Sequence, residues 1–177
     1  MGELKRELHK NSQVITRNSY MDTRDKILNV EDFVQIRSNR DLGRIVFTNG
    51  CFDILHPGHV DYLERASSLG DTLVVGLNSD KSVSRLKGPK RPVNPARDRT
   101  RVLAGLACVG FVLVFEEDTP YELICKVRPH VLVKGGDWPV EKIVGRDIVE
   151  ETGGMVLSLE LTPGHSTSRI IDRISNG

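Results

Sequence analysis

Short apolar segments alternate regularly with helical segments along this chain, and no other feature of the sequence restricts the fold as strongly. Continuous apolar runs of this length are typical of strands that are buried on both faces. Five of them predict strands: 44–48, 72–77, 111–115, 131–133 and 155–159. Proline or capping residues mark the predicted starts of the helices: Pro57, Asn94 with Pro95, Thr119 with Pro120, Pro139 and Ser166. The sequence therefore predicts an α/β fold with a doubly wound, five-stranded parallel sheet.

The first 25 residues lack the apolar periodicity of the rest of the chain. Residues 1–25 predict a polar N-terminal extension, and residues 26–177 predict one domain that opens with a helix over about 27–40. The longest mostly apolar run, 105–115, is far shorter than the roughly 20 residues that cross a bilayer. Three cysteines at unrelated spacings predict free thiols and no disulfide framework: Cys51, Cys108 and Cys125. We therefore expect a cytoplasmic protein that does not bind a membrane.

The charges of the chain nearly balance overall but not locally. The 25 basic and 24 acidic residues give a net charge of +1, which argues against a surface that binds polyanions throughout. Residues 81–101, however, contain eight basic residues and one acidic residue. No aromatic residue lies among these cations, so base stacking with single-stranded nucleic acid is not expected. The segment indicates either a solvated loop or a local site for a small anion such as a nucleotide phosphate.

The segment after the first predicted strand, from Thr48 to His59, contains the residues best suited to chemistry. Ligands of doubly wound sheets bind beyond the carboxyl ends of the strands, which is where this segment lies. Gly50 allows a ligand to approach the backbone, and Pro57 begins a helix whose free N–H groups attract phosphate. His56 and His59 are expected to point to one side of that helix start, so both imidazoles could meet one anion. A capping or core-edge role is the alternative. A zinc site would need ligands beyond the nearby Asp53.

This segment resembles the first signature of a nucleotidyltransferase superfamily, in which Gly-x-Phe-Asp is followed by His-x-Gly-His. The superfamily includes the cytidylyltransferases and pantetheine-phosphate adenylyltransferase. The resemblance covers about residues 27–174 and is greatest to the heptose 1-phosphate adenylyltransferases of ADP-heptose synthesis. Further segments carry it: 78–80, 85–88, 91–95, Arg99, 115–120, 134–138 and 166–168.

The resemblance implies a Rossmann-like nucleotidyltransferase fold and a specific reaction. ATP and D-glycero-β-D-manno-heptose 1-phosphate would give ADP-heptose and pyrophosphate, for the inner core of lipopolysaccharide. The chain is too short to include a kinase domain, so we expect a stand-alone form supplied by a separate heptose kinase. We also expect a homodimer. Mg²⁺ should accompany ATP, held by phosphate oxygens and water without a protein ligand.

The resemblance also implies a role for individual residues. The expected catalytic residues are His56, His59 and Lys87. The expected nucleotide-binding and phosphate-binding residues are Thr48, Asn49, Gly50, Phe52, Asp53, Arg91, Arg99, Gly135, Gly136, Asp137, Ser166, Thr167 and Ser168. The candidates for binding the acceptor substrate are Asn78, Asp80, Lys134 and Trp138. Trp138 could stack on a ligand or cover the edge of the core.

One nearby branch of the superfamily is the main rival. Glycerol-phosphate cytidylyltransferases carry Arg-Thr-Glu-Gly-Ile-Ser-Thr where this chain has residues 161–167, and the arginine is replaced here by Leu161. This chain also has Lys-Gly-Gly-Asp at residues 134–137, where the rival branch has an acidic equivalent. Both differences favour ATP over CTP. The alternatives are therefore a cytidylyltransferase acting on a polyol or another sugar phosphate, or a nucleotide-binding module without catalysis. Release of pyrophosphate would distinguish an enzyme from a module.

Overall fold

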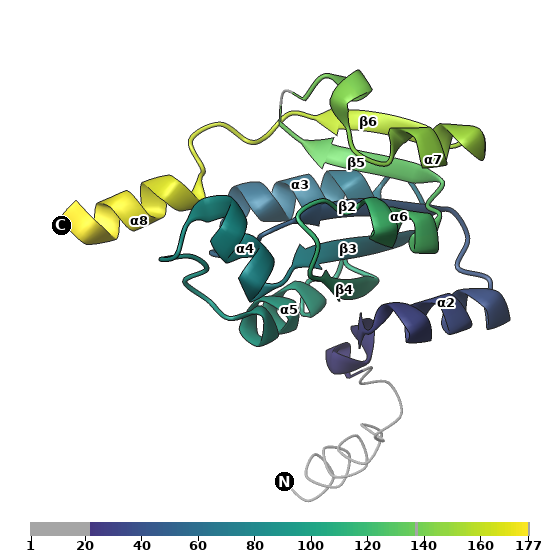
Figure 1. Cartoon of the computed structure of the whole chain (residues 1–177), viewed down its shortest axis with the longest axis horizontal. Helices are drawn as coiled ribbons and strands as arrows, with labels where there is room; N and C mark the ends of the chain where they lie inside the picture. The colour runs from purple at the N-terminus through teal and green to yellow at the C-terminus, as the bar shows by residue number, and fades with distance from the viewer. Residues whose placement is uncertain (1–21, 137, 177) are drawn as a thin grey trace, which may run out of the picture.

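A twisted parallel sheet forms the centre of the molecule (Figure 1). The computed structural model of the chain describes residues 22–136 and 138–176, so most of the predicted extension lies outside the described residues. The strands are β1 (Ile27–Leu28), β2 (Ile45–Gly50), β3 (Thr72–Asn78), β4 (Phe111–Phe115), β5 (Val131–Gly135) and β6 (Met155–Leu159). All strand pairs are parallel, which confirms the predicted α/β class and doubly wound sheet.

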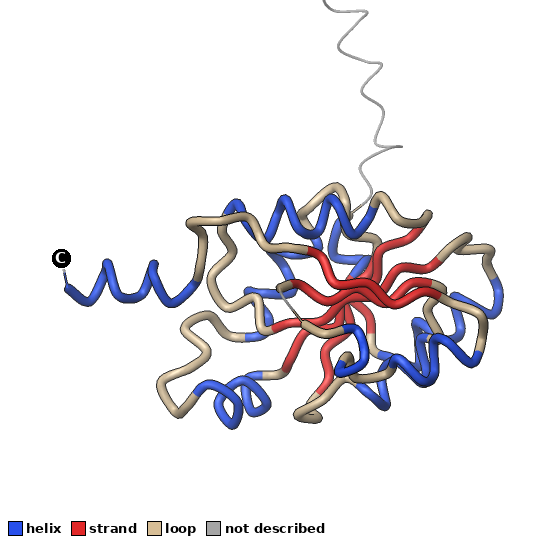
Figure 2. The backbone as a smooth tube through the Cα atoms, turned by 90° about the horizontal axis from the view of Figure 1, so that it is seen from above, coloured by secondary structure: helices blue, strands red, loops and turns tan. Residues whose placement is uncertain are grey.

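Helices cover both faces of this sheet (Figure 2). They are η1 (Thr23–Lys26), α2 (Val30–Asn39), α3 (Pro57–Ser67), α4 (Asp80–Lys87), α5 (Ala96–Ala104), α6 (Tyr121–Val127), η2 (Val140–Lys142), α7 (Arg146–Glu151) and α8 (Thr167–Asn176). On one face, α3 and α5 contribute Leu63 and Leu103 to the core. On the other face, α2, α6 and α7 contribute Phe33, Ile124 and Val149. None of the helices in the described part of the chain is both long and apolar enough to span a membrane.

The order of the strands determines where a ligand can bind. Along the sheet they run β1-β4-β3-β2-β5-β6, so the chain progresses in one direction from β2 to β4 and in the other from β5 to β6. The loops that leave β2 and β5 therefore diverge and open a crevice between them. The register keeps the strand ends at one edge, because Gly50 pairs with Leu77 and Asn78 with Phe115. The loops after four strands thus surround one site.

The sheet has six strands instead of the predicted five. Ile27 and Leu28, expected at the start of a helix, form β1 and pair with Val112 and Leu113 at the edge of the sheet. A strand of two residues is too short to show either an alternation or an apolar run. The helix expected over about 27–40 therefore begins three residues later, at Val30.

Helix α4 was not predicted. Residues 81–87 were interpreted as part of a cationic segment, and only Ser82 and Val83 of this helix are buried. The helix consequently lacks an apolar stripe that the sequence could reveal. Its start is fixed by Ser79, whose hydroxyl oxygen accepts a hydrogen bond from the Ser82 amide at 3.2 Å. The result is that Lys87 lies at the end of a helix beside the crevice, where the segment was expected to be a loop.

Candidate active site

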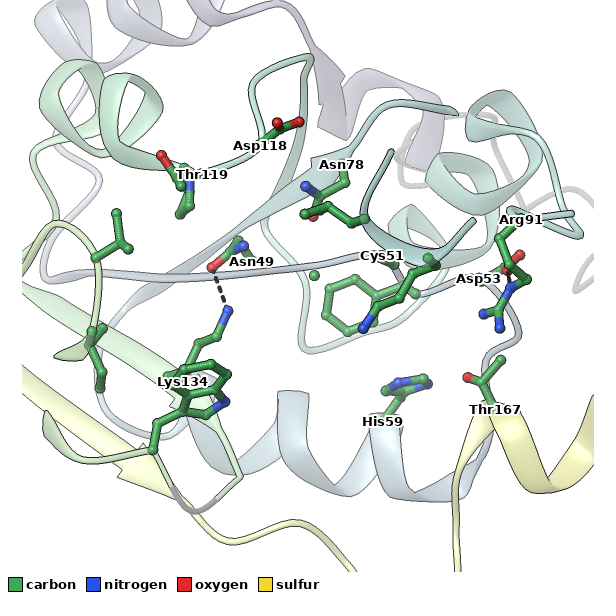
Figure 3. A pocket seen from close by; sticks show the side chains of 18 of the residues that line it. Asn49, Cys51, Asp53, His59, Asn78, Arg91, Asp118, Thr119, Lys134 and Thr167 are labelled. Carbon is green, nitrogen blue, oxygen red and sulfur yellow. Dashed lines mark hydrogen bonds and ion pairs between the residues drawn. The ribbon is translucent and has the colours of Figure 1, made fainter. Parts of the chain in front are cut away.

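A cavity of about 570 Å³ lies at the carboxyl ends of β2, β3 and β5 (Figure 3). It occupies the crevice that the strand order creates. Most of the predicted site residues line it: Asn49, Gly50, Phe52, Asp53, His59, Asn78, Lys87, Arg91, Lys134, Trp138, Thr167 and Ser168. The fold therefore brings residues that are far apart in the sequence to one place.

Several cavity residues were not predicted as site residues. They are Cys51, Leu86, Asp118, Thr119, Pro120, Leu132, Lys142, Ile143 and Val144. Asp118 and Thr119 belong to a segment that carried the family resemblance. Their position after the carboxyl end of β4 could have marked them as site residues. No feature of the sequence marked residues 142–144 as site residues. They reach the cavity through the connection between β5 and α7, whose path the sequence does not reveal.

His56 and His59 form a parallel stack at the start of α3. Their ring centroids are 3.8 Å apart with an angle of 16° between the ring planes, and the edge of Phe52 packs against His59 at 5.2 Å. His56 occupies the N-cap position but its side chain makes no capping hydrogen bond. Nδ1 of each ring is buried and has no hydrogen-bond partner in the described part of the chain. Buried polar atoms rarely stay unpaired, so these two nitrogens are suited to a ligand.

Both histidines are held in the neutral form by their surroundings. Burial lowers the pKa of His59 to about 4, and the neighbouring His56 adds to this effect. Burial also lowers the pKa of His56, with a smaller contribution from His165. Two imidazolium charges about 4 Å apart would repel each other by about 4 kcal/mol at an effective dielectric constant of 20. The site therefore presents two neutral imidazoles that a phosphate could induce to bind a proton.

Asp53 holds the cationic segment, residues 81–101, against the end of β2. Its carboxylate is buried and accepts hydrogen bonds from the backbone amides of Val93 and Asn94, at 2.7 and 2.9 Å. It also pairs with the guanidinium of Arg91, and the Asn94 side chain donates to the Asp53 carbonyl oxygen at 2.7 Å. Asp53 was expected to bind nucleotide. Its geometry instead favours a positioning role, because all of its bonds hold the loop before α5 against the end of β2.

Arg99 performs a similar function deeper in the structure. Only 2% of this residue is exposed, and its guanidinium donates to the carbonyl oxygens of Cys51, Asn78 and Asn94 at 2.6, 3.0 and 2.9 Å. It also donates to the carboxylate of Asp80 at 2.7 Å. Arg99 was expected to contact phosphate and Asp80 to contact the acceptor. Neither lines the cavity, because their charged groups are bonded to each other and to the surrounding backbone.

Three lysines line the cavity and supply positive charge to it: Lys87, Lys134 and Lys142. Lys134, at the end of β5, donates to the side-chain oxygen of Asn49 at 3.2 Å, and its burial lowers its pKa (Figure 3). Lys87 is exposed at the end of α4 and makes no ion pair within the described residues. Cys51 lies between these cations, yet burial raises the pKa of its thiol. The cavity therefore holds an unpaired cation and a neutral thiol, which suits binding of an anion better than nucleophilic catalysis by cysteine.

The remaining predicted residues lie at or beyond the margin of the cavity. The Thr48 hydroxyl is buried and hydrogen-bonded to the Tyr62 hydroxyl at 2.6 Å, and neither Gly135 nor Gly136 is among the lining residues. Ser166 caps α8 as expected, accepting from the amide of Arg169 at 3.2 Å. Asp137 lies outside the described residues. No ligand contact follows from the geometry of the described residues among them.

Lower pH should destabilise the protein through His59. Its pKa is about 4 in the folded chain and near 6.5 in the unfolded chain, so the unfolded state binds the proton first. The free energy of unfolding should therefore fall as pH decreases from about 6.5 to 4. His59→Asn removes this group, and urea denaturation across that range should show a smaller loss for the variant. The same pH dependence in both proteins would contradict the assignment.

Comparison with known proteins identifies the family. Residues 47–173 match the family described as cytidylyltransferase-like. The chain is 51% identical over 158 residues to the bifunctional protein HldE of Pelobacter propionicus, which covers 88% of this chain and 32% of that protein. It is 59% identical over 135 residues to the bifunctional protein HldE of Methylococcus capsulatus, covering 76% of this chain and 28% of the relative. The chain thus spans about a third of the length of these curated relatives or less.

Solved structures agree with the fold. A lipopolysaccharide core biosynthesis protein from Thermoplasma volcanium is 27% identical, with a TM-score of 0.56 over 68% of this chain and 97% of that one. Pantoate-beta-alanine ligase from Francisella tularensis, at 15% identity, has a TM-score of 0.57 over 80% of this chain and 68% of the ligase, and shows similarity of fold alone. The expected nucleotidyltransferase enzyme is confirmed by the family that residues 47–173 match. The chain belongs to the cytidylyltransferase-like family.

Proposed function

We propose that this enzyme transfers AMP from ATP to D-glycero-β-D-manno-heptose 1-phosphate and releases pyrophosphate. The observation that carries the proposal is the pair of stacked, neutral histidines at the start of α3, beside a cavity lined by three lysines. That arrangement offers donors and positive charge to phosphates. The choice of ATP and heptose phosphate is supported by the motifs of the sequence and by relatives named HldE.

The chemistry requires little covalent participation by the protein. An oxygen of the sugar 1-phosphate attacks the α-phosphorus of ATP, and the bond from that phosphorus to the bridging oxygen of the β-phosphate breaks. The electron pair of that bond leaves with pyrophosphate. Negative charge gathers on the oxygens of the α-phosphate and on the leaving group, so positioned donors and cations accelerate the step.

Residues of the cavity are placed to perform these tasks. His56, beside the cavity, and His59, which lines it, would donate to the α-phosphate and the leaving group, aided by the amide of Gly58 at the start of α3. Lys87 would neutralise charge on the reacting phosphates. The half-exposed Trp138 and the apolar side chains of Ile143 and Val144 form a wall suited to the adenine ring.

Polar side chains near the carboxyl ends of β3 and β4 suit the acceptor. Asn78 is buried and its amide donates to the Ser82 hydroxyl at 2.9 Å, while Asp118 is held by Arg85 at 2.7 Å. Thr119 lies beside Asp118 in the same wall of the cavity. Hydroxyl and carboxylate groups at fixed positions can bind the hydroxyls of a sugar.

Mg²⁺ is expected to arrive with ATP. When bound, it would neutralise charge on the phosphates. The two carboxylates that line the described part of the cavity are already engaged, Asp53 with Arg91 and Asp118 with Arg85. This suits an ion held by phosphate oxygens and water, as the sequence led us to expect. The homodimer and the separate kinase stay predictions.

The products of the reaction test the proposal directly. The full chain should be incubated with Mg²⁺, heptose 1-phosphate and either ATP or CTP, and the nucleotide sugars should be identified by mass spectrometry. We expect ADP-heptose and an equal amount of pyrophosphate with ATP, and little product with CTP. His56→Ala should form it about 100-fold to 1000-fold more slowly, as is typical for loss of one preorganised donor.

Other outcomes would point to the rival functions. CDP-linked product formed in preference, or product formed only with another phosphorylated polyol, would favour the rival cytidylyltransferase. Binding of nucleotide without release of pyrophosphate from any of these mixtures would favour a module without catalysis.

The cationic segment provides a second test with a matched control. Lys87→Ala should lower turnover and weaken ATP binding because Lys87 lines the cavity, and the difference from wild type should shrink at high salt. Lys90→Ala removes the same charge three residues away at an exposed position that does not line the cavity. It should change little. Equal effects at both positions would indicate diffuse attraction without a specific contact.

A further inference from the structure

Lys134 brings a positive charge into the crevice between β2 and β5. Phe47 of β2 pairs with Leu132 of β5. Asn49 and Lys134 follow two residues later in each strand, so their side chains lie next to each other. The lysine ammonium donates a hydrogen bond to the side-chain oxygen of Asn49 at 3.2 Å, and both residues line the active-site cavity (Figure 3). The ammonium is therefore held where the loops after β2 and β5 diverge.

No carboxylate neutralises this ammonium in the described part of the chain. The salt bridges between described residues do not include Lys134, and its hydrogen-bond partner Asn49 is neutral. The two carboxylates that line the described cavity, Asp53 and Asp118, are each paired with an arginine. Burial lowers the pKa of Lys134, because a desolvated ammonium is unfavourable. A half-buried cation with a neutral partner is suited to an anion that arrives with a substrate.

The proposed reaction brings two anions into this cavity, the triphosphate of ATP and the phosphate of the acceptor. In an in-line displacement the attacking oxygen and the leaving group lie on opposite sides of the α-phosphorus. The histidines at the start of α3, which would donate to the leaving group, mark the side of the pyrophosphate. In Figure 3, Lys134 and Asn49 lie on the other side of the cavity from His59 and Thr167. Lys134 is therefore on the side from which the acceptor phosphate attacks.

The side chains suited to sugar hydroxyls are within the same cavity. Asn78, Asp118 and Thr119 line it together with Lys134. In Figure 3 these three side chains also lie across the cavity from His59. An acceptor whose phosphate contacts the lysine can therefore extend its sugar toward them.

We propose that Lys134 binds the phosphate group of the acceptor and that Asn49 positions the lysine ammonium. The inference rests on the proposed nucleotidyl transfer and adds the residue that holds its nucleophile. Positive charge at this place reduces the repulsion between the sugar phosphate and ATP as they approach. Asn49 accepts one of the three N–H groups of the ammonium, so two stay available to phosphate oxygens. Lys134 forms no covalent bond and transfers no proton in this role.

Binding measured separately for the two substrates tests this role. Lys134→Met nearly keeps the length of the side chain and removes its charge. Equilibrium binding of D-glycero-β-D-manno-heptose 1-phosphate to the full chain should weaken about 10-fold to 100-fold, the usual effect of losing a hydrogen bond between charged groups. KM for this acceptor should rise by a similar factor. Binding of ATP in the absence of acceptor should be unchanged.

A matched variant controls for the loss of a lysine elsewhere. Lys126→Met removes an exposed lysine on α6 that does not line the cavity. It should bind both substrates as wild type does. Equal affinity for the sugar phosphate in wild type and Lys134→Met overturns the proposal, and so does an equal loss of affinity for ATP and for the sugar phosphate.

A charge-retaining variant separates binding from folding. Lys134→Met should melt no lower than wild type, because an ammonium without an ionic partner contributes little to stability. If it does melt well below wild type, Lys134→Arg decides between the two roles. An affinity of Lys134→Arg for the sugar phosphate well above that of Lys134→Met supports binding through charge. An equal loss in both variants overturns it.

The outcomes also distinguish this inference from the proposed function. Wild-type formation of ADP-heptose, with Lys134→Met retaining the wild-type KM for the acceptor, would leave the function intact and overturn the role of Lys134. Product formed only from another phosphorylated acceptor, such as glycerol 3-phosphate, would reject the heptose substrate. A loss of affinity for that acceptor in Lys134→Met would still support the lysine as the phosphate-binding residue. Failure of the wild-type chain to bind any of these phosphorylated acceptors would overturn both.

Discussion

The buried guanidinium of Arg99 is the interaction on which the active site depends. A charge in the interior is tolerated only when it is paired and hydrogen-bonded. Arg99 meets this requirement by bonding to the backbone after β2, at the end of β3 and before α5. These three segments carry the motif of residues 48–59, the candidate acceptor residue Asn78 and the cationic segment 81–101. One buried charge therefore fixes their relative positions. Losing it would take this partner from three carbonyl oxygens and would leave Asp80 with the backbone amide of Ala96.

This arrangement determines which charges remain available to a ligand. Arg99 is used by the backbone and Arg91 by Asp53, so the segment that contains eight basic residues presents few of them to the cavity. Lys87 faces it from α4 and Lys134 from β5. The histidines add no charge when the site is empty, because burial and their mutual proximity keep them neutral. A phosphate can therefore bind here without the free-energy cost of keeping several cations buried. The negative charge of the bound phosphate would then favour protonation of His56 and His59.

The alternation of apolar runs and helix starts was sufficient to predict the fold, and the motif was sufficient to predict where the cavity lies. The two local errors concern elements with little sequence pattern, the two-residue strand β1 and the charged helix α4. The roles of Asp53, Asp80 and Arg99 could not be predicted, because each depends on hydrogen bonds to segments that are distant in sequence. The sequence does not show whether a charged residue in a binding motif contacts a ligand or forms hydrogen bonds to the backbone.

The central claim is that the stacked histidines bind phosphates and gain charge as they do so. An NMR titration of the imidazole signals in the full chain, free and saturated with ATP in the absence of an acceptor, measures this directly. In the free protein His59 should titrate near pH 4. Bound ATP should raise its pKa clearly, because nearby negative charge stabilises the imidazolium form. An unchanged pKa for both His56 and His59 at saturating ATP would contradict the account.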